Sequence, residues 1–200
     1  MKKLILCILF LLSFISITAC RKKEEIVITA EDIRTNTLLA KNNGGLQVAT
    51  VEDFDKTYYN YSELSEFVKK EVDTYNKKAG GDKITIDSLE LREGKAILVL
   101  SFSGMDQYCN FNETSAAYFN GGAENIPIDL PTTLVRAKDG ERTDTAEVLR
   151  NKKYKILVIQ EPFDILVNGK IMFYSDNAQL LEENKVKSMG EDMTVIVFKP

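Results

Sequence analysis

The chain has 200 residues, with 26 Lys or Arg against 30 Asp or Glu, and its net charge at neutral pH is −4. This acidic balance disfavours a nucleic-acid partner, because phosphate backbones require clustered basic side chains. Histidine is absent from the whole sequence. Its absence excludes Ser-His-Asp triads, Cys-His dyads and histidine-based zinc sites.

The first 20 residues have the pattern of an export signal. A positive start at Lys2 and Lys3 is followed by an apolar run over residues 4–17, and small residues precede Cys20. The apolar run is short for a helix that spans a bilayer. An uncleaved helical anchor, in which Cys20 has no special role, is the alternative interpretation.

The tetrapeptide Ile17-Thr18-Ala19-Cys20 resembles the lipobox of bacterial lipoprotein precursors. This resemblance implies that residues 1–19 are a signal peptide that is removed. It also implies that a diacylglyceryl group on Cys20 anchors the chain to the extracytoplasmic face of a bacterial cell membrane. Residues 20–25 are then a charged tether, with a basic contact to anionic headgroups as the alternative.

The body of the chain resembles small uncharacterised lipoproteins of Gram-positive anaerobes. The resemblance lies in Val51-Glu52-Asp53-Phe54 and in residues 58–76. It contains no diagnostic motif and implies no activity. The function of the body therefore has to be inferred from its own residues.

Cys109 is the one cysteine that remains when Cys7 leaves with the signal and Cys20 carries the lipid. No disulfide within the chain is then possible. We expect Cys109 to be a small buried apolar residue, because no histidine is present to activate its thiol. The fold must be held by its core, and we expect neither a metal nor a cofactor.

The first elements after the tether are a hairpin and a helix. Strand-like residues 35–41 and 46–51 flank an Asn-Asn-Gly-Gly turn. Residues 61–79 then carry apolar side chains at helical spacing, between an N-cap at Asn60 and a stop at Gly80. The predicted apolar stripe consists of Leu64, Phe67, Val68, Val72 and Tyr75.

A second hairpin follows the helix. The alternation of apolar residues changes phase within residues 84–91, so we expect a β-bulge near Asp87-Ser88. A turn at Glu93-Gly94 leads into residues 96–102, which are apolar on both faces. Such a segment predicts a central strand that is covered on both sides.

The second half of the chain is rich in strands. We expect one hairpin around Asp139-Gly140, with arms within residues 132–149. We expect another within residues 165–174, where Asn168-Gly169 has the signature of a type I′ turn. Two further strands are expected over residues 155–160 and 194–199, the last docked into the sheet.

Strands in hairpins, one long helix and no βαβ alternation predict an α+β fold with a mainly antiparallel sheet. The amphipathic helix is expected to pack on this sheet. We expect residues 26–200 to form a single domain. The alternative is a division near residues 130–150, with the C-terminal hairpins forming a small sandwich or barrel.

Carboxylates are the side chains that remain for catalysis. Two carboxyl groups held about 5 to 9.5 Å apart can hydrolyse a glycosidic bond. Solvated faces and turns are the simpler interpretation of the acids in this chain. The acidic clusters are Glu31-Asp32, Glu52-Asp53 with Asp55, Glu182-Glu183 and Glu191-Asp192.

Residues 104–131 combine aromatic rings with Asn and Gln amides, after an expected short helix over residues 106–112. Apolar area with a few hydrogen-bonding groups is typical of a small binding surface. Alternatively, the rings pack over the sheet and the amides cap turns. The pair Tyr58-Tyr59 allows the same two interpretations. The candidate ligand-binding residues are Tyr108, Phe111, Asn112, Tyr118 and Asn120.

The leading hypothesis is a non-enzymatic, lipid-anchored module that binds a protein, peptide or glycan, or supports an envelope assembly. The alternatives are a carboxylate-based hydrolase of envelope glycans and an accessory solute-binding component of a transporter. A hydrolase requires two facing acids at the floor of a cleft. A binding module is expected to show an exposed aromatic patch instead.

Overall fold

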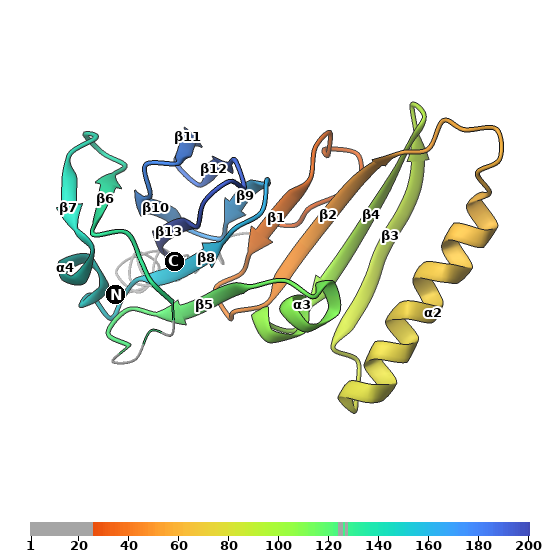
Figure 1. Ribbon diagram of the computed structural model, residues 1–200, viewed down its shortest axis with the longest axis horizontal. Coiled ribbons are helices and arrows are strands. Elements are labelled where there is room, and N and C mark those ends of the chain that lie inside the picture. Colours follow the sequence, from red (N-terminus) through yellow and green to blue (C-terminus); the bar gives the residue numbers. More distant parts are fainter. Residues whose placement is uncertain (1–25, 124–125, 127) are drawn as a thin grey trace, which may run out of the picture.

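The computed structural model describes residues 26–123, 126 and 128–200 (Figure 1), so the predicted signal, tether and Cys20 lie outside it. The described chain is an α+β protein whose strands pair mainly in antiparallel fashion. The predicted fold class is therefore confirmed. The strands form two sheets, however, where one was expected.

The first sheet has seven strands in the order β11-β12-β9-β1-β2-β4-β3. β1 and β9 pair in parallel, whereas the other neighbours are antiparallel. This sheet combines strands from both sides of residues 130–150. Its strands are β1 (Thr37–Ala40), β2 (Leu46–Asp53), β3 (Ile84–Arg92), β4 (Lys95–Phe102), β9 (Asp164–Val167), β11 (Ala178–Glu182) and β12 (Lys185–Ser188).

The second sheet has six strands in the order β5-β8-β13-β10-β6-β7. The predicted strands over residues 155–160 and 194–199 are β8 and β13. As expected, β13 is docked into the sheet, and it lies between β8 and β10. β5 pairs with β8 and was not predicted. The strands are β5 (Ala116–Asn120), β6 (Thr133–Arg136), β7 (Arg142–Asp144), β8 (Lys155–Ile159), β10 (Lys170–Tyr174) and β13 (Thr194–Lys199).

The hairpin around Asp139-Gly140 is confirmed, but its second arm is shorter than expected. β7 ends at Asp144, and the chain continues as the short helix α4 (Thr145–Leu149). The Asp144 side chain causes this change, because its Oδ1 accepts a hydrogen bond from the Glu147 backbone N–H and caps the helix.

One hydrophobic cluster joins the two sheets and the helices α2 (Tyr61–Ala79) and α3 (Met105–Asn112). Alternate residues of β2 and β4 face this cluster, as the two-residue period of a strand requires. The second sheet contributes side chains from β8, β13 and β10. Its fully buried members include Leu38, Leu46, Leu157, Ile159, Ile165, Ile196 and Phe198.

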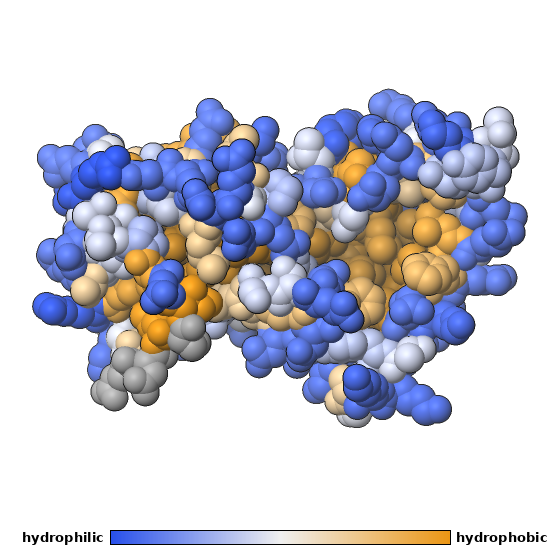
Figure 2. Space-filling view, viewed as in Figure 1, coloured by the Kyte–Doolittle hydropathy of each residue, from blue (hydrophilic) through white to orange (hydrophobic). Residues whose placement is uncertain are grey.

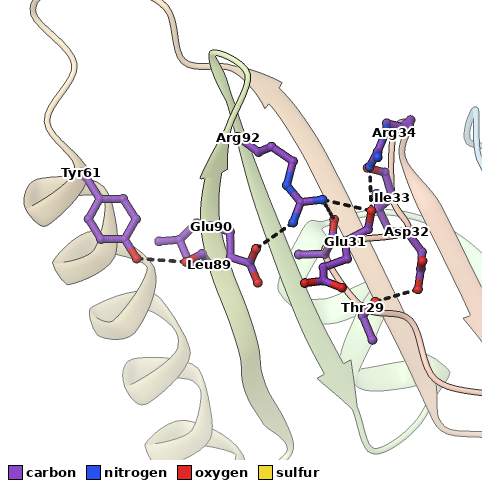
Figure 3. Close-up of polar contacts among 10 residues, drawn as sticks. Thr29, Glu31, Asp32, Ile33, Arg34, Tyr61, Leu89, Glu90 and Arg92 are labelled. Atoms are coloured by element: carbon purple, nitrogen blue, oxygen red, sulfur yellow. Dashed lines mark hydrogen bonds and ion pairs between the residues drawn. The ribbon is translucent and has the colours of Figure 1, made fainter.

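The opposite face of the seven-stranded sheet is covered by the N-terminal segment, residues 26–36. Arg92 of β3 fastens this segment (Figure 3), because its Nη1 donates to the backbone oxygens of Ala30 and Glu31 at 3.3 and 3.0 Å. The Arg92 guanidinium also pairs with Glu90 at 3.3 Å. The buried side chains on this face are Ile28, Ala30, Ile33, Leu39, Ala49, Ile97 and Val99.

The expected β-bulge is present, since the register between β3 and β4 shifts between Ile86 and Ser88. The extra residue, Asp87, accepts hydrogen bonds from Gln47 Nε2 at 2.7 Å and Ser101 Oγ at 2.6 Å. Gln47 Oε1 in turn accepts from the Ile28 N–H at 2.7 Å. The bulge therefore helps to hold the N-terminal segment in place.

The predicted type I′ turn at Asn168-Gly169 is wrong. β9 and β10 belong to different sheets, and neither turn residue has a positive φ. The Asn168 N–H instead donates to the Ala40 oxygen, and the chain crosses from one sheet to the other. Glycine is required at 169 for another reason, because a Cβ there would lie 2.3 Å from the Lys199 backbone oxygen.

Candidate functional site

Four large aromatic side chains are exposed around the first half of α2. The exposed fractions are 76% for Tyr58, 42% for Tyr59, 42% for Tyr61 and 61% for Phe67. Apolar side chains also gather in a hollow beside α2, over the sheet face formed by β2 and β4 (Figure 2). Exposed apolar area of this kind marks interaction sites more often than scattered single residues do.

The hollow exists because α2 is fastened at its ends and covers the sheet only along a narrow seam. Tyr61 Oη donates to the Leu89 oxygen at 2.9 Å (Figure 3), and Asn76 Nδ2 donates to the Ile84 oxygen at 2.8 Å. Both acceptors belong to β3, the last strand of its sheet, so α2 protects this edge. In the helix only Val68 and Val72 are buried.

The predicted bounds and caps of this helix are confirmed. Asn60 Oδ1 accepts from the N–H groups of Ser62 and Glu63, and Gly80 ends the helix in the left-handed conformation. The predicted apolar stripe is wrong at Phe67, whose side chain is exposed. Phe67 lies one position before the buried Val68, and its side chain lines the cavities beside the helix.

We define the α2 groove as two adjoining cavities of about 520 and 410 Å³, both lined by Phe67, Val68 and Leu98. Volumes of this order are typical of ligand sites. The larger cavity, the aromatic end, is also lined by Thr50, Glu52, Asp53, Phe54, Tyr58, Tyr59, Asn60, Glu63, Leu64, Leu89 and Ala96. The smaller, the α3 end, is also lined by Glu71, Thr74, Tyr75, Lys78, Leu100, Asn110 and Phe111.

The rings at the aromatic end contact one another. Phe54 stacks on Tyr59 with centroids 4.9 Å apart, and Tyr58 meets Tyr59 edge-on at 4.9 Å. Asp53 accepts a hydrogen bond from Lys95 Nζ at 2.6 Å, and this bond and the ammonium charge lower the pKa of Asp53. The aromatic end is therefore a wall of rings beside an ionised carboxylate.

Tyr108, the first candidate from the sequence, is a core residue. It is 1% exposed, its ring meets Phe102 edge-on, and its Oη donates to Glu161 at 2.9 Å. Thr114 Oγ1 donates to the same carboxylate at 3.0 Å. Burial and the Glu161 charge raise the pKa of Tyr108, so this phenol stays neutral. The alternative interpretation, a ring packed over the sheet, fits its position.

Phe111 and Asn112 are the last two residues of α3, and their side chains have different roles. Phe111 is half-buried, meets Tyr75 edge-on at 5.6 Å and lines the α3 end of the groove. Asn112 Nδ2 donates to the Tyr108 oxygen at 3.0 Å. Of the five candidates, Phe111 is thus the one that lines the α2 groove.

Tyr118 and Asn120 lie on β5 and line a separate polar cavity of about 410 Å³. Tyr118 Oη donates to the Lys41 oxygen at 3.0 Å, and Asn120 Oδ1 accepts from Lys155 Nζ at 2.6 Å. The structure therefore distributes the five candidates over three places and does not bring them together in one site.

Tyr118 makes the stability of the protein depend on pH. Burial raises the pKa of Tyr118 to about 12, against about 10 in an unfolded chain. The resulting stabilisation is complete below pH about 10 and is lost as the pH rises towards about 12. We expect the urea midpoint of the protein to fall as the pH rises across this window. The fall should be smaller for Tyr118→Phe. Tyrosinate absorbance measures the ionisation of the tyrosines directly. An equal fall in both proteins would contradict this role.

A cavity of about 890 Å³ lies between β6, β10 and β11, and three basic and two acidic side chains line it. Arg136 pairs with Asp139 and Glu141 at 3.2 and 2.9 Å, and Lys170 pairs with Glu183 at 3.3 Å. Two of the three basic side chains are thus paired within the protein, whereas the α2 groove leaves Phe67 exposed to solvent, so we regard the α2 groove as the better candidate site.

Cys109 is half-buried, and its Sγ donates to the Ala116 oxygen at 3.4 Å. Burial raises the pKa of this thiol, which favours the inert form. Among residues 26–123, 126 and 128–200, no cluster of three or more His, Cys, Asp or Glu side chains is placed to hold a metal ion.

Comparisons with protein-family models, curated proteins and solved structures give no match for this chain. Within the part of the chain that the structure describes, no helix is both long and apolar enough to cross a membrane. The function must therefore be inferred from the groove itself.

Proposed function

We propose that the protein is a lipid-anchored, extracytoplasmic binding module of a bacterial envelope, in which residues 26–200 act as one domain and the α2 groove binds an apolar peptide segment. The observation that carries this proposal is the 61% exposure of Phe67 between two cavities of about 520 and 410 Å³. Leaving a phenylalanine in water forgoes about 2 kcal/mol of burial energy, which a ligand can recover.

The position of the N-terminal segment supports this arrangement. Ile26 packs with the cluster on one face of the seven-stranded sheet. Leu98 and Leu100, which line the groove, point to the opposite face. A tether of residues 20–25 spans at most about 20 Å. A lipid on Cys20 therefore holds the module from the face opposite the groove and leaves the groove open to a partner.

The hydrolase alternative has less support. A glycosidase needs one carboxyl group that remains protonated as the general acid. Lys95 lowers the pKa of Asp53, which favours the ionised form instead. The other acidic clusters, Glu31-Asp32, Glu182-Glu183 and Glu191-Asp192, do not line the α2 groove.

The anchor is tested by mass spectrometry of the protein extracted from membranes of its bacterial host. We expect the first residue to be Cys20 carrying a diacylglyceryl group, and we expect Cys20→Ser to abolish this modification. An unmodified Cys20, or residues of the signal still attached, would exclude the lipoprotein hypothesis.

The groove is tested with Phe67→Ser and a capped Leu-Ala-Leu-Phe peptide, titrated by calorimetry into the full-length protein in nanodiscs of zwitterionic lipid. We expect the substitution to weaken binding about fivefold or more, since aromatic anchors dominate such interfaces. Leu181→Ser is the matched control, because Leu181 is 42% exposed and lies on β11. Equal binding by both variants would contradict the assignment of the groove.

A further inference from the structure

We propose that the aromatic end of the α2 groove recognises a basic side chain, arginine or lysine, within an otherwise apolar peptide segment. This inference rests on the proposed function and names the chemistry of its ligand. It is carried by the charges, the rings and the helix terminus that meet at this end of the groove.

The side chains that line the aromatic end and carry a charge at neutral pH are all acidic. They are Glu52 and Asp53 from β2 and Glu63 from the first turn of α2, and all three are exposed. Lys95 pairs with Asp53 from the neighbouring strand but does not line the cavity. The charge of Lys95 also reaches Glu52, and Lys56 near Asp53 pairs with Asp55. The acids at this end still outnumber the two ammonium groups, so the net charge is negative and attracts a cation.

The rings beside these acids suit the same ligand. Tyr58 is 76% exposed, and it is joined edge-on to Tyr59, which stacks on Phe54. Aromatic faces attract the cations of arginine and lysine through their quadrupole. Carboxylates and rings at one end of a groove can therefore hold both the charge and the apolar stem of a basic side chain.

The start of α2 does not offset this preference for a cation. A helix N-terminus normally attracts anions through its free N–H groups. Here Asn60 Oδ1 accepts from the Ser62 N–H at 2.9 Å and the Glu63 N–H at 3.4 Å. The Glu63 carboxylate also lies in the first turn, where its negative charge compensates the partial positive charge of the helix N-terminus.

The apolar part of the ligand is defined by the remainder of the groove. From the aromatic end, the apolar lining continues through Leu98 and Phe67 to Leu100 and Phe111 at the α3 end. At that end Glu71 and Lys78 carry opposite charges and favour neither sign. The occupant that fits is thus a segment with a basic residue near one end and apolar residues along the rest.

The test compares two capped peptides, Leu-Arg-Leu-Phe and the same peptide with citrulline in place of arginine. Citrulline keeps the shape of arginine but has no charge. Each is titrated by calorimetry into the full-length protein in nanodiscs of zwitterionic lipid, with empty nanodiscs as the blank. We expect the arginine peptide to bind about tenfold more tightly, with the difference shrinking as salt is added.

The acids are tested one at a time. We expect Glu52→Gln and Glu63→Gln each to weaken the arginine peptide about threefold and to leave the citrulline peptide unchanged. Tyr58→Ala, at a side chain too exposed to be needed for folding, should weaken the arginine peptide about threefold. Glu66→Gln is the matched control, because Glu66 is exposed on α2 and lines neither cavity.

The outcomes separate this inference from the proposed function. If both peptides bind equally and Phe67→Ser weakens both, the groove binds apolar segments and the preference for a basic residue is overturned. If neither peptide binds, both proposals are overturned. If the arginine peptide binds more tightly but Glu66→Gln weakens its binding as much as Glu63→Gln does, the attraction is a general effect of net charge. The assignment of the basic residue to the aromatic end is then overturned.

Discussion

Replacing Gly121 with alanine should lower the free energy of unfolding by about 3 kcal/mol, the upper range for overpacking in a rigid site. Gly121 is buried directly after β5, and a Cβ there would lie 2.0 Å from the Asn151 backbone oxygen. The Gly121 N–H donates to the Tyr154 oxygen at 2.8 Å, and the Gly122 N–H to the Leu149 oxygen. The Asn151 backbone lies between two residues, Leu149 and Tyr154, whose oxygens are hydrogen-bonded to this glycine pair. It therefore cannot move away from the added Cβ without breaking these bonds.

Urea denaturation followed by circular dichroism measures this loss. Gly104→Ala is the matched control, because Gly104 has an extended φ of −180° and an added Cβ would meet only the flexible Gln107 side chain at 3.0 Å. We expect this control to cost about 1 kcal/mol or less, the usual difference at a helix N-cap. Similar losses for both variants would show that the loop before β8 is not a rigid support for β5.

Replacing Phe198 with alanine should cost about 4 kcal/mol, as expected for a large aromatic side chain removed from a packed core. Phe198 is fully buried on β13, between Lys155 of β8 and Ile171 of β10. Its ring lies 6.2 Å from that of Tyr118. The cavity left behind would lie in the cluster that joins both sheets.

Phe67→Ala provides the comparison for this prediction, since it removes the same atoms from a ring that is 61% exposed. We expect its cost to be about 0.5 kcal/mol, within the usual range for surface positions. The same denaturation experiment reports both values. A large loss at Phe67 would mean that the ring supports the fold and is not held free for a ligand.

The features predicted correctly from the sequence depend on residues close together in the chain. The hairpin of β1 and β2, the bulge at Asp87 and the ends of α2 are set by turn residues, by alternation and by caps. The division into two sheets and the crossover at Asn168 depend on which distant strands pair. Alternation cannot encode that choice, because buried strands of either sheet have the same pattern.

The candidate site was predicted less well, for a related reason. Phe67 fits the helical spacing of an apolar stripe, so the sequence assigned it to the core. Its exposure arises from how α2 is held, through the bonds of Tyr61 and Asn76 to β3. Tyr108 was chosen as a ligand-binding ring, but its hydrogen bond to Glu161 joins residues far apart in the chain. The early signals of the groove were the candidate Phe111 and the pair Tyr58-Tyr59.

The parallel pairing of β1 with β9 also constrains the order in which the protein folds. Thr37 lies opposite Asp164, so the seven-stranded sheet stays incomplete until most of the chain is available. Contacts between such distant residues slow folding. Meanwhile, the free edge of β1 is open to pairing with other chains. A chain with this topology therefore completes its seven-stranded sheet only after the C-terminal third has been synthesised. Until then, shielding the free edge of β1 in the β1–β2 hairpin from other chains prevents aggregation.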